Sequence, residues 1–523
     1  MSTFIKVHPG EKHLGHSLRE LFEIELDLAT AGPRGTARTL HEQLRAAILD
    51  GRLKAGVKLP PSRSSAAYFG VSRNTVNEVY SRLSSEGLVE ASPGSGTYVA
   101  RHALLTDPAA RIAAEPPEGV PLNPFWRQEE VRAAQEFWHI RPVSARGPGT
   151  VEFRPGVIDT RPFPFDLFRQ LVARQLRKLV KGTGNYEIPA GRQGSLALRT
   201  AIGTHIALTR AVLCQPDDIM VTAGAQQAFD LLARTLVTPG ETVVAVEDPC
   251  YPPMRTAFAA AGAKIVPVPV DVEGMVVEAI PPEARIICVC PSHQFPLGVT
   301  LSKRRRLALE QLAEDRGAVI VEDDYDGEFR YGGAALQALH RPETADRVFY
   351  IGTFSKCMFP ALRLGFVVAP RWARQTLALV KSSLDWHCPT TLQDALADFI
   401  SGGHLARHIR KMRQIYDERR MLLLERLERD FAPWLTPLPC DYGIHVAALA
   451  VGDQDLEALI PVLVKEGVNI LNLRRFQSKA GGRDGLIFGF GTTELADIDR
   501  GLDRLRGLLD QKSTQRPPFS QSL

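Results

Sequence analysis

A lysine that directly follows an apolar run is the residue of this chain best suited to covalent chemistry. Lys356 closes the segment GTFSK, residues 352–356, which continues the apolar run VFYI. A lysine after a buried strand can reach a ligand at the carboxyl edge of a sheet, where its amine can form a Schiff base with a carbonyl group. Arg363 follows shortly after, and together with Thr353 and Ser355 it can bind a phosphate dianion.

A carboxylate and a tyrosine stand at the end of a second apolar run. Asp323 closes AVIVED, residues 318–323, and Tyr325 lies two residues further on. A carboxylate at a buried strand end can keep a pyridine nitrogen protonated, and a neighbouring tyrosine can hydrogen-bond an oxygen on the same ring. The acidic run around Asp323 would also suit a metal cluster or a solvated turn. Its pairing with Lys356 favours a ring ligand, so we expect no metal.

These groups match the needs of pyridoxal 5′-phosphate (PLP), which requires a lysine, an acid for its ring nitrogen, phosphate donors and a ring-stacking group. Gly224 joins the run DIMVT to a helical segment that begins near Gln226, and the free N–H groups at such a helix start form an anion site. Tyr251 in EDPCY is a candidate for stacking, although a lone aromatic is more often a core residue. Tyr186 is a candidate to reach the phosphate bound by a neighbouring subunit.

The elements that position these residues alternate along the chain from about residue 151 onward. Helical patterns separate apolar, strand-like runs at residues 218–224, 241–249, 284–291, 317–324 and 348–356. Near-continuous apolar strands between helices predict an α/β domain with a parallel sheet covered on both faces. We assign this domain to residues 151–510 and the Pro- and Ala-rich residues 102–150 to a linker.

A short basic unit precedes the linker. Residues 34–101 carry ten Lys and Arg against five Asp and Glu, whereas the whole chain has a net charge of only +4. Apolar residues at helical spacing, with Ser62 and Ser72 as N-caps and Gly70 as a stop, predict three helices. A glycine-tipped hairpin, PGSG at residues 93–96, follows them. A basic unit of this kind suggests binding to a polyanion, although a solvated basic face would give the same charge pattern.

The third predicted helix would place its N-terminal end in the major groove of double-stranded DNA, where Arg can pair with guanine and Asn with adenine. The residues expected to contact DNA from this helix start are Ser72, Arg73, Asn74, Thr75 and Asn77. Arg63, at the start of the second helix, and Gly94, at the hairpin tip, suit contacts to phosphate or to the minor groove. The alternative is a small helical module for protein interaction.

Two sets of motifs resemble known families. The pattern LPPSR…GVSRNTV…GSGTYV makes residues 34–101 similar to the GntR-type winged helix, and Asn77 departs from it because several relatives carry Arg there. The phrases CPSHQFPLG, VEDDYDGEFRY and GTFSKCMFPALRLG make residues 151–510 similar to fold type I aminotransferases. The whole chain thus resembles the MocR subfamily of GntR regulators.

The resemblance implies a role for each candidate residue. Lys356 would form the Schiff base with PLP, Asp323 would hold the ring nitrogen, and Tyr325 would hold the 3′-oxygen. Tyr251 would stack on the ring. The phosphate would be bound by Ala225, Gln226, Ser355 and Arg363. The family also implies a head-to-tail homodimer, in which Tyr186 acts across the interface.

Two departures from the aminotransferase pattern affect the predicted chemistry. The Asn-Pro-x-Gly turn of the enzymes is replaced by FPLG at residues 295–298, so His293 or Gln294 would have to hold the 3′-oxygen, or no residue does. The C-terminal strand that commonly carries a carboxylate-binding Arg has the sequence LIFGFG, without an Arg. Arg474 or Arg475 could bind the carboxylate of an effector instead, although a surface basic pair is an equal alternative.

These observations predict a cytoplasmic, PLP-dependent transcriptional regulator whose larger domain senses PLP itself or a small amino compound. No apolar run is long enough for a membrane span, and the seven scattered cysteines suggest a reducing compartment. The alternative is an active aminotransferase that carries a DNA-binding domain, and the missing strand Arg argues against its efficient turnover. A plain DNA-binding protein with a degenerate body conflicts with the intact cofactor residues.

Overall fold

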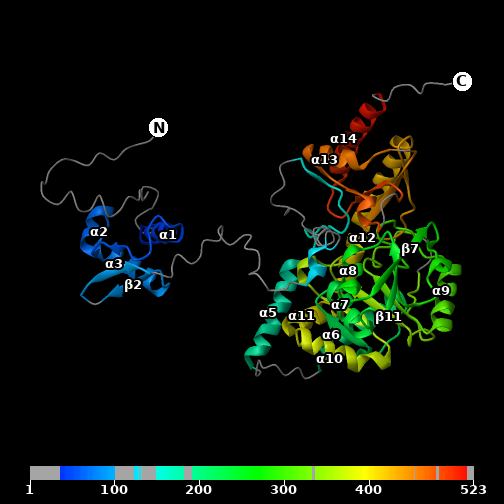
Figure 1. The fold of residues 1–523 in the computed structure, drawn as a ribbon, viewed down its shortest axis with the longest axis horizontal. Helices are drawn as coiled ribbons and strands as arrows, with labels where there is room; N and C mark the ends of the chain where they lie inside the picture. The colour runs from blue at the N-terminus through cyan, green and yellow to red at the C-terminus, as the bar shows by residue number, and fades with distance from the viewer. Residues whose placement is uncertain are drawn as a thin grey trace. The chain divides into compact units, whose positions relative to one another are not determined.

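The computed structural model of the chain forms two compact units, Met1–Leu122 and Asn123–Leu523, and each is considered by itself (Figure 1). The boundary between them falls within the predicted linker, most of which lies outside the described residues. The structure describes residues 36–92, 94–100, 123–128, 131, 149–181, 191–332, 336–452, 454–478 and 482–514.

The N-terminal unit packs three helices against a small antiparallel sheet. Its elements are α1 Thr36–Leu49, β1 Lys58–Leu59, α2 Ser62–Phe69, α3 Arg73–Ser85, β2 Val89–Ser92 and β3 Gly96–Val99. β3 is the central strand and pairs with β1 on one side and β2 on the other. Leu40, Leu44 and Ile48 of α1 are buried in one core with the inner face of α3, at the spacing expected for a helix. The predicted three helices and hairpin are confirmed.

The helix ends of this unit follow local capping chemistry. Ser72 is the N-cap of α3, where its hydroxyl accepts a hydrogen bond from the backbone N–H of Thr75 at 3.1 Å. Gly70 ends α2 in the left-handed region, with a φ of 65°. The prediction of Ser62 as the N-cap of α2 is wrong by one residue, because Pro61 holds the cap position and Ser62 is already helical. Proline fits this boundary because the helix start does not need its missing N–H.

The larger unit is built on a mixed eight-stranded sheet with the order β5-β12-β11-β10-β9-β6-β7-β8. Its strands are β5 Ile219–Thr222, β6 Val243–Asp248, β7 Lys264–Asp271, β8 Gly274–Met275, β9 Ala284–Val289, β10 Val319–Asp324, β11 Val348–Thr353 and β12 Gly365–Val368. β7, β6, β9, β10 and β11 are parallel, as predicted. β12 and β8 are antiparallel to their neighbours, which corrects the expectation of a wholly parallel sheet. The chain reaches both without a crossover α-helix, which a parallel neighbour would require.

Helices cover both faces of this sheet. They are α5 Phe165–Lys181, α6 Leu196–Arg210, α7 Ala225–Leu236, α8 Pro252–Ala260, α9 Lys303–Arg316, α10 Arg374–Leu384 and α11 Thr390–Ser401. α7, α8 and α10 share one core with the sheet, whereas α9, α6 and α11 belong to cores on the other face. Neighbouring residues of β11 show the alternation, because Ile351 joins the first core and Tyr350 joins one of the others.

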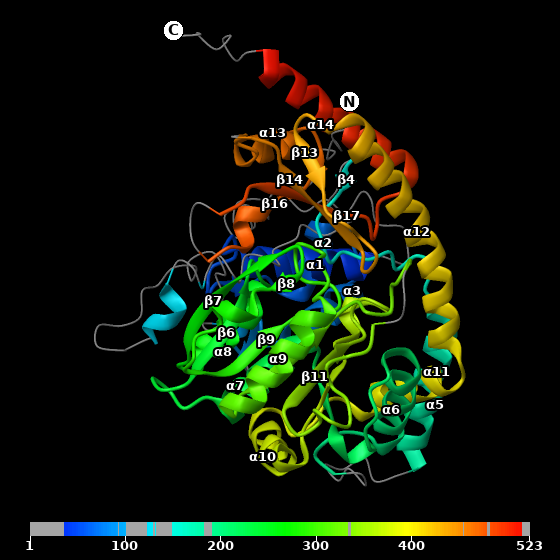
Figure 2. The same ribbon diagram turned by 90° about the vertical axis from the view of Figure 1, so that its right-hand side faces the viewer.

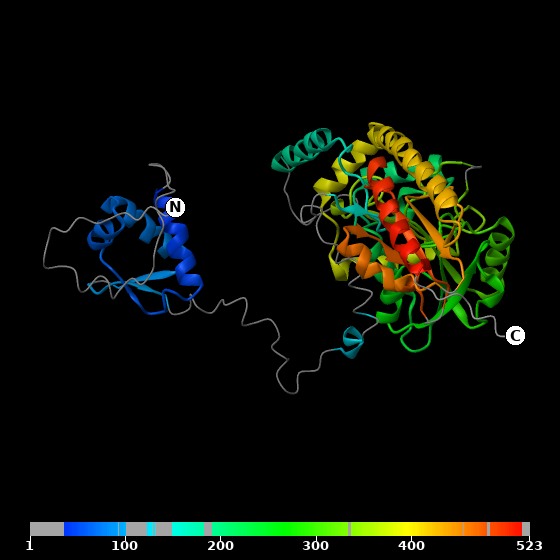
Figure 3. The same cartoon turned by 90° about the horizontal axis from the view of Figure 1, so that it is seen from above.

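A smaller antiparallel sheet with the order β13-β14-β17-β16 forms the C-terminal part of the unit. Its surroundings include a short parallel pair of β4 and β15. The elements are β4 Val151–Glu152, α12 His404–Asp430, β13 Leu435–Pro437, β14 His445–Ala450, α13 Ile460–Lys465, β15 Val468–Asn469, β16 Leu471–Asn472, β17 Gly485–Gly489 and α14 Leu495–Thr514. The long α12 contacts α11 at one end and the smaller sheet at the other, and α14 lies beside it (Figure 2 and Figure 3).

None of the helices in the described ranges is both long and apolar enough to cross a membrane. All seven cysteines are free thiols, and all except Cys214 are buried. The expectation that they form no disulfide framework is confirmed. The buried thiols pack as small apolar side chains of the core.

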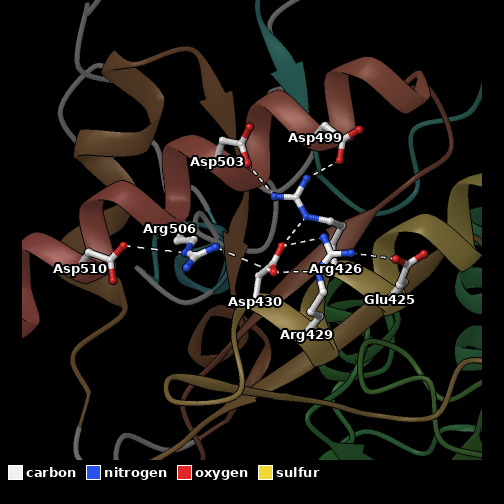
Figure 4. A network of polar contacts seen from close by, with 8 residues as sticks. All are labelled: Glu425, Arg426, Arg429, Asp430, Asp499, Asp503, Arg506 and Asp510. Carbon is white, nitrogen blue, oxygen red and sulfur yellow. Dashed lines mark hydrogen bonds and ion pairs between the residues drawn. The ribbon is translucent and has the colours of Figure 1, made fainter.

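An arginine cluster fastens α12 to α14 (Figure 4). The side chain of Arg426 on α12 is only 10% exposed, and it pairs with Asp430 at 2.5 Å, with Asp503 of α14 at 2.6 Å and also with Asp499 of α14. Arg429 is 56% exposed and pairs with acids of its own helix. A largely buried guanidinium among carboxylates is costly to remove, whereas an exposed ion pair is screened by water.

We expect Arg426→Ala to lower the free energy of unfolding by about 2–3 kcal/mol, because it removes the largely buried cation that joins Asp430 of α12 to two acids of α14. Arg429→Ala is the matched control on the same helix, and its loss should be below about 1 kcal/mol. Denaturant unfolding followed by circular dichroism measures both variants. Equal losses in the two variants would contradict the central place given to Arg426.

Candidate functional site

Parallel strands bring distant residues together at one edge of the large sheet, because their carboxyl ends all meet there. β10 leads to Asp323, β11 leads to Lys356, and β5 leads into α7. The antiparallel β12 begins at the same edge, since Gly365 pairs with Thr222 of β5 and with Thr353 of β11. This edge borders a cavity of about 340 Å³.

The cavity wall joins two parts of the unit. Nine residues singled out in the sequence line it, namely Ala225, Gln226, Tyr251, Asp323, Tyr325, Thr353, Ser355, Lys356 and Arg363. The wall also includes residues that no motif marked, among them Pro155, Gly156, Ile444 and His445. His445 opens β14, so the cavity lies between the edge of the large sheet and the smaller sheet.

Lys356 offers an amine with altered basicity. Its Nζ donates a hydrogen bond to the carbonyl of Gly156 at 2.8 Å. Burial lowers the pKa of this amine from 10.5 to about 8, although the carboxylates of Asp326 and Asp323 act in the opposite direction. A substantial fraction of the amine is therefore neutral near physiological pH, and the neutral amine is the form that attacks a carbonyl.

Asp323 offers a carboxylate oxygen without a donor. Its Oδ1 is buried and has no hydrogen-bond partner among the residues that the structure describes. Its Oδ2 lies 3.8 Å from the Cys290 thiol. Burial raises the pKa of this carboxyl from 3.8 to about 8, and the nearby Asp324 and Asp326 add to the rise. A ligand that brings a cationic N–H to Oδ1 would satisfy both the hydrogen bond and the charge.

An anion site is built at the start of α7. Gly224 is the N-cap with a φ of 79°, and a Cβ there would lie 3.1 Å from the Arg363 guanidinium, so glycine permits this close approach. Arg363 donates to the carbonyl of Ala223 at 2.8 Å. The hydroxyls of Thr353 and Ser355 are hydrogen-bonded to each other at 3.0 Å in the same wall. Free helix N–H groups, two hydroxyls and a guanidinium together suit a phosphate dianion.

Two tyrosines are among the aromatic residues of the wall. The Tyr325 hydroxyl lies 2.9 Å from Nδ1 of His293, and burial raises the pKa of Tyr325 well above its usual range, so the hydroxyl keeps its proton. The Tyr251 ring packs edge-on against Phe295, with ring centroids 5.9 Å apart. Both rings are thus held in place by neighbours while they face the cavity.

His293 and Gln294 are not among the residues that line the cavity. His293 lies behind Tyr325. The Gln294 amide donates to the carbonyls of Pro249 at 2.7 Å and Phe295 at 2.8 Å, which uses its N–H groups inside the loop. The structure therefore places neither residue where it would contact a ligand directly.

Arg474 and Arg475 also lie outside the cavity wall. They belong to the short turn Leu473–Phe476, in which Arg474 pairs with Asp484 at 3.0 Å. Phe476 of this turn packs on Phe295 with ring centroids 5.3 Å apart, so the turn supports the wall from behind. Tyr186, predicted to act across a subunit interface, lies outside the described residues.

His445 is a titratable wall residue that sequence reasoning missed. Its Nε2 donates to the carbonyl of Pro296 at 3.0 Å, and its ring lies 4.5 Å from that of His293. Burial lowers the pKa of His445 well below its usual range, so the ring is neutral. No sequence signal pointed to it, because a histidine at the start of an apolar strand is an ordinary core residue until the tertiary fold brings it to the cavity.

The N-terminal end of α3 forms an exposed polar surface on the smaller unit. Arg73, Asn74 and Asn77 are exposed, and Arg73 donates to the Ser62 hydroxyl at 3.3 Å. These side chains start from one end of a helix, which is the arrangement that enters a major groove. Arg63 of α2 is exposed as well.

Two further predicted contacts have local roles in the fold. The Ser72 and Thr75 hydroxyls are hydrogen-bonded to each other at 2.8 Å, in addition to the cap that Ser72 provides. Gly94 is exposed at the hairpin tip with a φ of 74°, a conformation that favours glycine. A tip without a side chain can approach a phosphate backbone closely.

Comparison with known proteins gives matches for both units. Residues 36–99 match the gntR family of bacterial regulatory proteins, and residues 167–487 match the aminotransferase class I and II family. The chain is 36% identical to the probable rhizopine catabolism regulatory protein MocR of Rhizobium meliloti, over 90% of this chain and 92% of that protein. It is 31% identical to the HTH-type pyridoxine biosynthesis transcriptional regulator PdxR of Corynebacterium glutamicum, over 90% and 95%. The α-aminoadipate aminotransferase LysN of Thermus thermophilus is similar in structure, with a TM-score of 0.64 and 26% identity over 74% of this chain and 98% of LysN.

The fold and the site define a transcriptional regulator made of a winged helix-turn-helix domain and a fold type I aminotransferase-like domain. The chain belongs to the MocR-type regulators of the GntR family, which carry both parts in one chain. The family resemblance drawn from the motifs is confirmed.

We expect Arg73→Ala to weaken binding to the specific DNA site by about tenfold or more, because a base contact by Arg contributes roughly 1–3 kcal/mol. Fluorescence anisotropy at fixed salt, with DNA from upstream of the chain's own gene, measures the effect. Arg38→Ala on α1 is the control, since Arg38 is exposed and pairs with Glu42 of its own helix. An unchanged affinity of the Arg73 variant would reject α3 as the recognition helix.

Proposed function

We propose that this regulator depends on PLP. Residues 34–101 bind double-stranded DNA, and residues 151–510 bind PLP at the cavity beside Lys356. PLP alone, or PLP joined to a small amino compound, changes DNA binding because it favours one of two conformations of the protein. A bacterial regulator of this kind acts in the cytoplasm, where the chromosome lies.

The pairing of Lys356 with Asp323 in one cavity carries the proposal. The two side chains follow different strands, yet both line the same wall. The amine is partly neutral, and the carboxylate has a buried oxygen without a donor in the described residues. PLP supplies an aldehyde that condenses with amines and a ring that withdraws electrons once its nitrogen is protonated. The aldehyde suits the Lys356 amine, and the protonated ring nitrogen suits the Asp323 carboxylate.

The remaining wall residues complete the binding set. Tyr325 would hold the 3′-oxygen, and Tyr251 would stack on the ring. The phosphate would be held at the start of α7, with the donors Ala225, Gln226, Thr353, Ser355 and Arg363. The Asp323 carboxyl, whose pKa burial raises to about 8, ionises when a cation approaches, because an opposite charge lowers that pKa.

A protein with steady aminotransferase turnover is the alternative. Of the described residues that line the cavity, the cationic ones are Lys356 and Arg363, and Arg363 lies at the anion site. The described wall therefore offers no second guanidinium for the carboxylate of an amino-acid substrate. This favours sensing over turnover.

We further propose a head-to-tail homodimer in which Tyr186 reaches the phosphate held by the partner subunit. The helix α5 supports an interface, because Phe165, Leu176 and Leu179 are 48%, 51% and 42% exposed while the helix packs on α11. Large apolar side chains gathered on one helix are typical of a surface that another chain covers.

We expect the purified protein to carry a visible absorption band, and borohydride treatment to fix the cofactor mass on the peptide that contains Lys356. Lys356→Ala should lose the band while its DNA affinity without PLP stays within about twofold, because the winged helix is a separate unit. Lys303→Ala, which removes an exposed lysine of α9, is the control. A colourless wild-type protein, or rapid steady turnover with amino acids, would contradict the proposal.

The pH dependence of PLP uptake follows from the shifted pKa values of Lys356 and Asp323. Uptake needs Lys356 neutral and Asp323 ionised, and the pKa of each is about 8. The rate at which apoprotein mixed with PLP gains its visible band should therefore rise from about pH 6 through pH 8 and level off above about pH 9. A lysine model amine mixed with PLP should continue to rise towards about pH 10. A rate that does not change between about pH 6 and 8 would contradict these shifts.

A further inference from the structure

A histidine and an aspartate stand behind the Tyr325 hydroxyl. Nδ1 of His293 lies 2.9 Å from the Tyr325 oxygen and 3.0 and 3.1 Å from the two carboxylate oxygens of Asp326. The side chains of His293 and Asp326 are both only 1% exposed. A single ring nitrogen therefore meets a carboxylate and a phenol at once.

The carboxylate decides which atom carries the proton. A carboxylate can only accept hydrogen bonds, so Nδ1 of His293 must carry a hydrogen to bond to Asp326. Nε2 of His293 is buried and has no hydrogen-bond partner among the described residues, which fits a neutral ring protonated at Nδ1. The Tyr325 oxygen then accepts from Nδ1–H, and its own O–H is left to donate elsewhere.

We propose that Asp326 and His293 form a positioning pair that aims the Tyr325 O–H into the cavity, where it donates to an oxygen of the bound ligand. This inference rests on the proposed function, since the ligand oxygen is the 3′-oxygen of PLP. Neither residue touches the ligand. Both act through Tyr325, which lines the wall.

The backbone around His293 is shaped to fit the imidazole. Gly443 has a φ of 76°, and a Cβ there would overlap both the His293 ring and the Asp326 carboxylate. A Cβ at Gly298 would lie 3.3 Å from Nε2 of His293. The ring is thus enclosed by glycines on two separate segments, which holds its hydrogen-bonding atom at one orientation.

The charged groups around Tyr325 keep it a donor. It faces Asp326 and Asp323 from its own segment, Cys290 from the end of β9 and Cys440 from the segment before β14, and these groups add to the effect of burial in raising the pKa of Tyr325. Lys356 and the neutral His445 lie in the same wall. A phenol in such surroundings stays protonated, so its hydrogen is available to the ligand.

A bound metal would be a competing use of the same side chains. One possible metal-ligating atom from each of His293, Asp326 and His445 lies within 4.8 Å of those of the other two residues. However, the ring nitrogen of His293 that faces Asp326 is Nδ1, which donates to that carboxylate, so a metal held jointly by these two side chains would have to displace its hydrogen. The hydrogen-bonded pair is therefore the arrangement that the contacts favour.

The test is the midpoint pH at which the visible band of the PLP-loaded protein titrates. In Asp326→Asn the charge that holds the hydrogen on Nδ1 is lost, so the ring proton moves to Nε2 and the Tyr325 O–H turns to the lone pair of Nδ1. The ligand oxygen then loses its donor, and the midpoint should rise by about one pH unit because a donor stabilises the anionic oxygen. Loss of the negative charge alone would lower the midpoint, because an anion stabilises the protonated form. The sign of the shift therefore separates positioning from simple electrostatics.

Two further comparisons make the result specific. Tyr325→Phe should raise the midpoint as well, and combining it with Asp326→Asn should add nothing. Asp230→Asn, which changes a partly exposed acid of α7 that pairs with Arg234 of its own helix, is the control and should leave the midpoint unchanged. If Asp326→Asn fails to fold, His293→Asn, which keeps an N–H, should hold the midpoint, and His293→Leu, which frees Asp326 to accept from Tyr325, should raise it.

The possible outcomes separate this inference from the proposed function. A wild-type protein without a visible band overturns PLP binding itself. A normal band with an unchanged or lowered midpoint in Asp326→Asn, or additive effects with Tyr325→Phe, overturns only the positioning pair. Stoichiometric metal that elemental analysis finds and a chelator removes would also overturn it.

Discussion

The burial of the Asp323 carboxylate at the end of β10 is the interaction around which the larger unit is organised. A charge there is unfavourable without a cation, and this is why its pKa rises to about 8. Lys356 lies in the same wall and is the nearby source of a cation. However, burial lowers the pKa of its amine, so the amine loses its proton readily. Neither group can fully satisfy the other. The wall is therefore electrostatically incomplete, and the absence of a side chain at Gly224 brings the Arg363 guanidinium close to the start of α7.

Local signals predicted the parts of the site that depend on strand ends. Asp323, Lys356 and Tyr251 each follow an apolar run, and parallel strands deliver such residues to one edge whatever the details of packing. The antiparallel direction of β12 carried no comparable signal, because an apolar run has the same pattern in either direction. His445 and the position of His293 behind Tyr325 were beyond reach for a different reason. Both depend on contacts between segments far apart in the chain. The type of a residue does not reveal whether its side chain lines the cavity or lies behind a residue that does.

The winged helix was more predictable because its chemistry is local. The Ser72 cap, the Gly70 stop and the apolar spacing of α1 each act within a few residues, so the sequence motif and the structure agree almost residue by residue. The single error, at Ser62, reflects a preceding proline that displaced the cap by one position. The smaller unit forms its own core, which is why signals within residues 34–101 were enough to predict it.

The long helix α12 adds stiffness to the part of the fold that surrounds the cavity. At 27 residues it is a rod of roughly 40 Å, fastened to α14 by Arg426 at one end and packed on α11 at the other. It runs from α11, which covers one face of the large sheet, to the smaller sheet, so one long helix connects the elements behind both parts of the cavity wall. A change in the separation of the two parts of the wall would therefore have to bend this helix or break its contacts with α11 or α14.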